Sequence, residues 1–113
     1  MAAQIPAPLV ELHRHLDGSL RVSTIAELAA DNGLTVPDDL CFQPGMGLSE
    51  ALSKFVFTLS VLQGEAAVRR VAHEMCDDAD AEGIGHLEIR FAPQLHRNAS
   101  MDRIVDAVLD GVG

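Results

Sequence analysis

The segment LVELHRHLDG, residues 9–18, decides how the rest of the chain is interpreted. Its first half is short and largely apolar, which predicts a buried β-strand. Side chains alternate between the two faces of a strand, so His13 and His15 point in the same direction. The pair Asp17-Gly18 is typical of a turn, and the strand therefore ends near it. We expect two imidazoles and a carboxylate to gather at the carboxyl end of this strand.

The two histidines have the spacing of metal ligands. Neutral imidazole is a favoured ligand of zinc and other borderline divalent cations, and a strand holds two such groups rigidly. We therefore predict that His13 and His15 bind one divalent cation, with zinc as the leading candidate. In a chain with five histidines, a His-x-His pair also arises by chance, and such pairs are commonly solvated or packed.

Charge and aromatic content argue against a nucleic-acid partner. The 113 residues include 8 basic and 17 acidic side chains, a formal net charge of −9, and the basic residues are scattered. A phosphate backbone is bound by clustered cations, and no such cluster is present in the sequence. All 4 aromatic residues are phenylalanines, too few to stack on single-stranded nucleic acid. A small soluble substrate fits this composition better.

Cysteine usage and the N-terminus predict a cytoplasmic protein without a membrane anchor. Cys41 and Cys76 form no Cys-x-x-Cys motif, so neither a disulfide framework nor a structural zinc finger is expected. Residues 1–6 lack the basic and apolar regions of a signal peptide. No segment approaches the roughly 18 consecutive apolar residues of a membrane span. The oligomeric state is not determined by these patterns.

The first half of the chain predicts two helices separated by a long loop. Thr24 followed by Glu27 is a capping box, and the helix that it begins is ended by Gly33 in the left-handed conformation. Residues 34–47 contain prolines and glycines without a period, which is typical of a long loop, and such loops are usually functional. In the helix that follows, we expect a buried stripe formed by Leu48, Leu52, Phe55, Leu59 and Leu62.

The second half predicts a helix, a strand and a helix. An amphipathic helix covers about residues 65–82, and Ser100 caps a last helix. Between them Leu87, Ile89 and Phe91 alternate with charged residues as in a strand. We expect Arg90 to pair with Glu11 or Glu88, since unpaired charges inside a barrel are costly. A half-exposed strand with a solvated charged face is the alternative.

The order of these segments favours parallel strands joined by right-handed crossovers. A doubly wound sheet begins in the same way, but the first strand-to-helix turn carries no Gly-x-Gly-x-x-Gly or Walker motif. We therefore expect a barrel. A complete TIM barrel needs roughly 250 residues, and an apolar period still continues at residues 109–113. We expect residues 1–113 to be one part of a longer barrel domain.

Three segments together resemble the adenosine deaminase family. The sequence HLDG, which follows His13-Arg14, resembles the end of that family's first barrel strand. Residues 49–55, SEALSKF, resemble its lid helix. Residues 83–95, GIGHLEIRFAPQL, resemble its second strand with the following loop. Order and spacing agree over about residues 9–96. The resemblance implies an α/β fold that is the N-terminal portion of a TIM (β/α)8 barrel, with a long helical lid insertion after strand 1. It also implies that residues 1–113 are the N-terminal fragment of a single metal-dependent hydrolase barrel domain.

The resemblance also implies a chemistry. Family members hydrolyse adenosine or a related purine to an inosine-like product and ammonia, with a zinc-activated water as nucleophile. His13 and His15 match two zinc ligands, and Asp17 matches the contact to the ribose. The remaining ligands and the proton-transferring residues come from later strands in the family, so no catalytic residue is expected within this fragment, which alone should be inactive.

The lid helix implies further substrate contacts. Leu48, Leu52 and Phe55 match positions that cover the nucleoside and exclude water, although core packing would equally explain Leu52 and Phe55. Ala51 departs from the bulky aromatic often present, and the larger space that it leaves makes a bulkier purine such as aminodeoxyfutalosine an alternative to adenosine. Adenine is a further alternative substrate within the family.

Two other classes of function remain open on the sequence. Other amidohydrolase-type metal enzymes share the His-x-His strand, and a non-catalytic metal-binding domain would also fit. His73, His86 and His96 are expected to have structural or surface roles rather than to bind metal, with His96 a weak candidate for a substrate contact.

Overall fold

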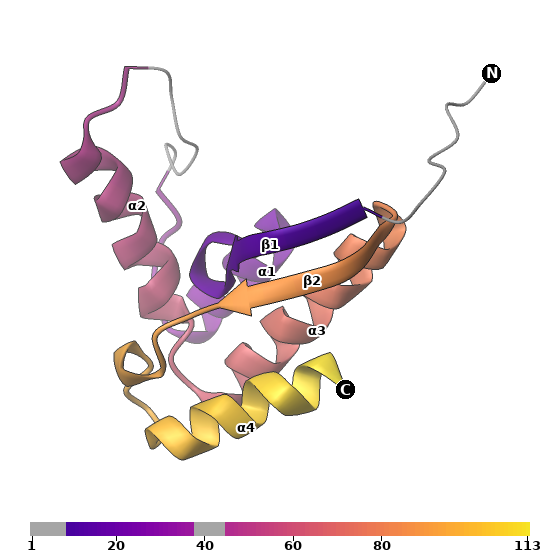
Figure 1. Ribbon diagram of the computed structural model, residues 1–113. Helices are drawn as coiled ribbons and strands as arrows, with labels where there is room; N and C mark the ends of the chain where they lie inside the picture. The colour runs from indigo at the N-terminus through magenta and orange to yellow at the C-terminus, as the bar shows by residue number, and fades with distance from the viewer. Residues whose placement is uncertain (1–8, 38–44) are drawn as a thin grey trace.

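The computed structural model describes residues 9–37 and 45–113. Two parallel strands, β1 and β2, form a sheet that is accompanied by four α-helices and two short 3-10 turns (Figure 1). In chain order the segments are β1 (Leu9–His15), η1 (Leu16–Gly18), α1 (Val22–Asp31), α2 (Leu48–Val61), α3 (Glu65–Ala81), β2 (Ile84–Arg90), η2 (Pro93–Leu95) and α4 (Met101–Val112). The predicted order of a strand, three helices, a second strand and a last helix, with parallel strands, is confirmed.

The two strands run in the same direction, so their carboxyl ends meet at one edge of the sheet. Leu9 is opposite Ile84, and His15 is opposite Arg90, with an irregularity between Glu11 and Arg14. Leu87 and Ile89 face the helices and pack against the core, as their alternation with charged residues predicts. The turn η1 and the loop that begins after β2 therefore leave from the same edge.

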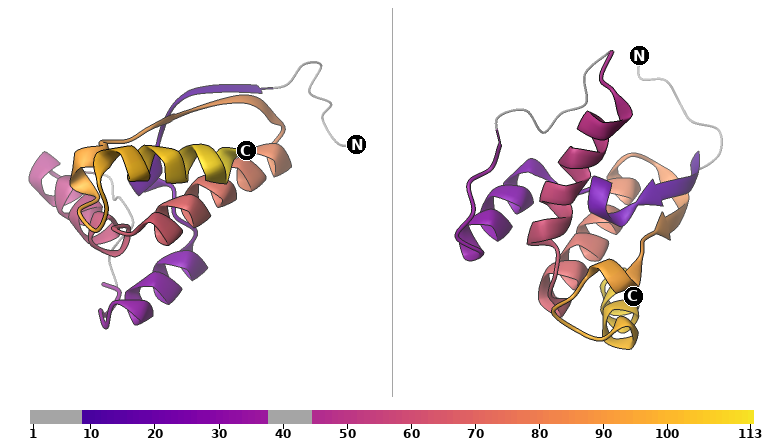
Figure 2. Two further views of the ribbon diagram at one scale, coloured as in Figure 1. Left: turned by 90° about the horizontal axis from the view of Figure 1, so that it is seen from below. Right: turned by 90° about the vertical axis from the view of Figure 1, so that its left-hand side faces the viewer.

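The first strand is less buried than its apolar sequence predicts. Val10 and Leu12 are 60% and 53% exposed. Within the described residues, β1 pairs only with β2, and the helices cover a single face of the two-stranded sheet (Figure 2). Hydrophobic residues of β1 therefore remain in solvent because the structure places no partner on them.

The core lies between the sheet and the helices α3 and α4. Its members come from η1, the four α-helices and the junction between α2 and α3, and include Leu16, Leu28, Ala29, Val61, Leu62, Val68, Val71, Ala72, Met75, Ile104, Ala107 and Val108. The expected apolar face of the helix over 65–82 is thus confirmed. Ser100 accepts a hydrogen bond from the backbone N–H of Arg103 at 3.3 Å, so the predicted cap of α4 is also confirmed. No helix within residues 9–37 and 45–113 has the length and apolarity needed to cross a bilayer.

The C-terminal end of α1 follows the sequence, whereas its beginning does not. Gly33 has φ of 67°, and the N–H groups of Leu34 and Gly33 bond to the carbonyls of Ala29 and Ala30, which is the Schellman arrangement. The predicted capping box at Thr24 is wrong, because the helix already begins at Val22. The side chain of Thr24 is fully buried, and its hydroxyl donates a hydrogen bond to Glu74 of α3.

The predicted buried stripe of α2 is wrong in its first half. Leu48 and Leu52 are 76% and 52% exposed, whereas Lys54 is only 7% exposed. Val61 and Leu62, at the C-terminal end, are almost completely buried. The N-terminal half of α2 extends away from the sheet (Figure 1), so within the described residues Leu48 and Leu52 are not covered by the core. The long loop predicted over residues 34–47 lies partly outside the described residues, as does Cys41.

Candidate functional site

The two histidines of β1 converge at the carboxyl end of the strand. Their Nε2 atoms are 3.0 Å apart, and the ring centroids are separated by 4.9 Å at an interplanar angle of 60°. Both side chains are exposed. The convergence that the alternation of β1 predicts is therefore present. Two ring nitrogens at this separation can share one proton between them, or can both face a single cation.

The spacing of the two nitrogens fits one metal ion. A Zn–N bond is about 2.0–2.1 Å, so two nitrogens of a tetrahedral site lie about 3.3 Å apart. The 3.0 Å separation of the His13 and His15 Nε2 atoms is close to that value. Within residues 9–37 and 45–113, no group of three or more His, Cys, Asp or Glu residues is arranged to hold a metal. The described chain thus offers two donors, and a catalytic zinc site commonly has three protein ligands.

The turn η1 fixes the direction of the groups that follow the strand. Leu16 is fully buried in the core, and His15 and Asp17 lie on either side of it in the sequence. The Ser19 hydroxyl donates to the carbonyl oxygen of His15 at 2.6 Å and closes the turn. Leu16 points into the core. Asp17 comes next in η1, so its half-buried side chain lies at the edge of the sheet where the histidine pair is.

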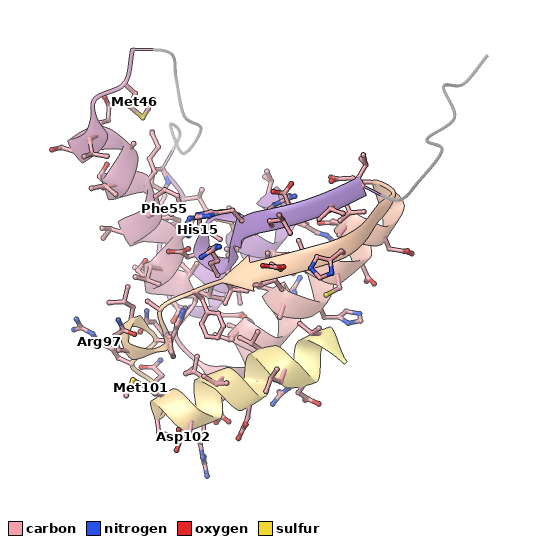
Figure 3. All side chains as sticks on the ribbon, viewed as in Figure 1. His15, Met46, Phe55, Arg97, Met101 and Asp102 are labelled. Atoms are coloured by element: carbon pink, nitrogen blue, oxygen red, sulfur yellow. The ribbon has the colours of Figure 1, made fainter. Side chains whose placement is uncertain are left out.

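Phe55 of α2 reaches this edge. The ring of Phe55 lies beside His15, with centroids 6.4 Å apart and an interplanar angle of 61° (Figure 3). It also lies against Gly18, where an added Cβ would be 2.9 Å from Cε1 of Phe55. The turn signal at Gly18 was visible in the sequence, but its contact with a helix 37 positions later was not.

The other two lid residues, Leu48 and Leu52, do not share the contact that Phe55 makes with His15. Leu48 and Leu52 lie in the N-terminal half of α2 and are largely exposed. The packing alternative for Leu52 is therefore wrong. Of the three lid residues singled out in the sequence, Phe55 is the one with a ring contact to the histidine pair.

The remaining histidines have partners of their own. His86 lies 2.8 Å from a carboxylate oxygen of Glu88, and His73 lies 3.3 Å from Asp77. His96 is 2% exposed, and its Nδ1 bonds to the carbonyl oxygen of Leu62. These contacts agree with the structural or surface roles that the sequence predicts for them.

Arg90 does not have the predicted ion pair. Its side chain is exposed, and no salt bridge to Glu11 or Glu88 is found in the described part of the chain. Glu88 instead contacts His86. This face of the sheet is open to water, so the charge of Arg90 is hydrated and needs no partner. The alternative of a solvated charged strand face is the one that the structure has.

A network of charged groups holds α1 against α3 behind the site. Arg21 binds Asp78 through two nitrogens at 2.8 and 3.1 Å, and the hydrogen bond from Arg21 holds the pKa of Asp78 below its ordinary value. Glu74 accepts hydrogen bonds from Thr24 and Arg70. Burial alone would raise the pKa of Glu74, but these hydrogen bonds outweigh it and the pKa is lowered. The network orients the helix that follows η1.

Comparisons with known proteins agree with this architecture. The family model for adenosine deaminase matches residues 8–113. A probable adenosine deaminase of Dictyostelium discoideum is 42% identical over 120 residues, covering 93% of this chain and 15% of its own. An adenosine deaminase of Shewanella halifaxensis is 39% identical over 116 residues, covering 93% of this chain and 35% of its own. The crystal structure of adenine deaminase from Arthrobacter aurescens superposes with a TM-score of 0.78 at 28% identity, over 94% of this chain and 35% of that one.

The fold is therefore that of a partial α/β barrel, two parallel strands with their helices. More particularly, the chain belongs to the adenosine deaminase family. It spans about a third of the length of the Shewanella relative and less of the Dictyostelium one.

Proposed function

We propose that the protein containing this chain hydrolyses the 6-amino group of an adenine-type purine, with adenosine as the first candidate and inosine and ammonia as products. The observation that carries the proposal is the convergence of the His13 and His15 Nε2 atoms, 3.0 Å apart, at the carboxyl end of the first strand. Family membership supports the reaction class. Both co-substrates, the purine and water, are small molecules.

We assign His13 and His15 as two ligands of one divalent cation, with zinc as the leading candidate. Their donor chemistry fits, because each can present a neutral imidazole nitrogen toward the same point. When bound, such an ion lowers the pKa of a water molecule to about 7 and so supplies hydroxide at neutral pH. The chain's own contribution is to hold both nitrogens on a strand whose end is fixed by the buried Leu16.

We assign Asp17, Leu48, Leu52 and Phe55 to the substrate. Asp17, beside the histidines, is suited to accept hydrogen bonds from the hydroxyl groups of a ribose. Phe55 lies against His15 and would form an apolar wall for the purine. Leu48 and Leu52, exposed on the same helix, supply apolar surface that a bound purine could cover. Exclusion of water by these side chains strengthens every polar contact inside the site.

The active unit that we propose is larger than residues 1–113. Two imidazoles leave a catalytic zinc short of the three protein ligands usual for it, and both strands have an unpaired edge within the described residues. We therefore treat residues 1–113 as the N-terminal part of one barrel domain and expect the isolated chain to be inactive and poorly folded. The lone cysteines of the sequence favour action in the cytoplasm.

A second candidate substrate is the free base adenine. The structural similarity to the Arthrobacter aurescens adenine deaminase supports it. Ala51 instead supports a bulkier purine such as aminodeoxyfutalosine, since its small, half-buried side chain on α2 leaves the lid without a bulky group at that position. Another amidohydrolase reaction is the alternative outside purine chemistry.

The test is ammonia release by the protein that contains this chain, with zinc supplied, from adenosine, adenine and aminodeoxyfutalosine in parallel. Turnover of adenosine with loss of activity in His13→Ala supports the proposal. Turnover of adenine or aminodeoxyfutalosine alone would correct the substrate, and hydrolysis of amide or phosphoester substrates without purine turnover would reject the reaction class.

A further inference from the structure

The C-terminal end of α2 is tied to the loop after β2 by the side chain of Gln63. Its Nε2 group donates to the carbonyl oxygen of Leu95 at 3.1 Å and to that of Leu59 at 2.6 Å. Its Oε1 atom accepts the backbone N–H of Arg97 at 2.7 Å. The side-chain amide of Gln63 thus donates to the main chain of residue 95 and accepts from the main chain of residue 97.

His96, between those two residues, makes a second connection. Its side chain is 2% exposed, and its Nδ1 atom contacts the carbonyl oxygen of Leu62, which is itself fully buried. A carbonyl can only accept, so Nδ1 carries the hydrogen. The ring of Phe91 packs at an angle of 61° against the imidazole, with centroids 6.3 Å apart. Adjacent residues 62 and 63 are therefore both bonded to the segment 95–97.

Three apolar side chains nearer the other end of α2 are exposed. Leu48, Leu52 and Val56 are exposed by 76%, 52% and 67%. Phe55 contacts Gly18 and His15 from the same helix. An α-helix is stiff over two turns, and Phe55 is about 9 Å along the axis from Val61, the last residue of α2. The place where the C-terminal end is fixed therefore determines where the ring of Phe55 lies.

We propose that Gln63 and His96 are positioning residues, which fix the C-terminal end of α2 to the loop after β2 and so hold Phe55 against the histidine pair. The loop leaves the same edge of the sheet as η1, so the connection links the two parallel strands through the helix that covers their ends. The expected change in KM for the purine rests on the proposed function. The expected change in the position and mobility of α2 does not depend on activity.

The experiment compares Gln63→Ala with Arg69→Ala in the protein that contains this chain. Arg69→Ala is the matched control, because it removes an ion pair to Asp110 at 2.6 Å between α3 and α4. Hydrogen exchange of α2 and α3 amides and the steady-state constants for the purine are measured. In Gln63→Ala we expect α2 amides to exchange about three- to tenfold faster and KM to rise by a similar factor, as loss of a hydrogen bond implies. Exchange in α3 and kcat should stay near wild type.

A second pair of variants separates the hydrogen bond from packing. His96→Asn keeps an amide donor near the position of Nδ1, whereas His96→Leu keeps apolar volume without a donor. We expect α2 amides to exchange at a rate closer to wild type in the Asn variant and faster in the Leu variant. Equal exchange in Gln63→Ala and wild type, or equal acceleration in α2 and α3, would overturn the inference. Absence of purine turnover in the wild type would reject the proposed function and leave the exchange result to decide this inference.

Discussion

The ring of Phe55 lies against the backbone of Gly18, so closely that a Cβ atom at position 18 would be 2.9 Å from Cε1 of Phe55. Real Cβ contacts are essentially never this short, so any larger residue at position 18 must displace the ring. Phe55 in turn lies beside His15. The absence of a side chain at Gly18 therefore determines how near the lid helix comes to the histidine pair.

Replacement of Gly18 by Ala should move Phe55 away from His15. The ring is the far end of a side chain and can rotate, so we expect a loss of stability below about 1.5 kcal/mol and a clear rise in KM for the purine. A double-mutant cycle with Phe55→Leu measures the coupling. If Gly18→Ala raises KM as much in the Phe55→Leu background as alone, the contact is not the cause.

Replacement of either histidine by Ala should remove the bound metal. Loss of a group that only supports a ligand lowers metal affinity about 10- to 100-fold, and loss of the ligand itself should exceed that. Metal content after dialysis, measured by mass spectrometry, gives the result. His86→Ala is the control, since His86 is also an exposed strand histidine but pairs with Glu88. Equal metal content in His13→Ala and His86→Ala would refute the assignment.

Replacement of Asp17 by Ala should weaken nucleoside binding and leave the metal content unchanged. A hydrogen bond to a charged group contributes about 1.5–3 kcal/mol, which corresponds to a loss of affinity of about 10- to 100-fold. Calorimetric titration with a nucleoside product measures it, with the exposed Asp31 changed to Ala as a charge-matched control. Loss of metal with unchanged nucleoside affinity would instead identify Asp17 as a ligand.

Acid should destabilise the contact between α1 and α3 through Glu74. Hydrogen bonds from Thr24 and Arg70 outweigh burial and lower the pKa of Glu74 from its ordinary value of 4.5. The folded protein therefore binds this proton less readily than the unfolded chain. The resulting stabilisation is present above pH 4.5 and is lost as the pH falls through the lower folded pKa.

Denaturant unfolding of wild type and Glu74→Gln between pH 7 and pH 3 checks this sign. We expect the difference in unfolding free energy between the two proteins to shrink as the pH falls. A difference that stays constant or grows toward pH 3 would contradict it.

Replacement of Gly111 by Ala should separate α3 from α4. A Cβ at position 111 would clash with the carbonyl oxygen of Arg69 and would lie 3.0 Å from Cβ of Ala72. A backbone atom cannot move aside as a side chain does, so we expect destabilisation of about 1–3 kcal/mol despite the better helix propensity of Ala. Thermal unfolding measures it, with the exposed Asp106→Ala on the same helix as reference. Equal or higher stability of Gly111→Ala would show that the helices adjust without cost.

Local signals in the sequence were sufficient for much of the scaffold. The period of α3, the Ser100 cap of α4 and the left-handed Gly33 each depend on residues within one or two turns of one another. The convergence of His13 and His15 is of the same kind, because alternation along a single strand places both rings on one face. Such features are encoded in a few neighbouring residues and need no knowledge of distant partners.

Tertiary structure decided which side chains those local patterns bury. Thr24 has the sequence of a helix cap, yet it is buried against Glu74, 50 positions later. Leu52 has the period of a core residue but is exposed, and Lys54 is buried instead. The contact of Gly18 with Phe55 likewise joins separate segments. Burial depends on which surface lies opposite, and that surface is formed by residues far away in the chain, so periodicity predicts a helix and its faces but not the partner that covers them.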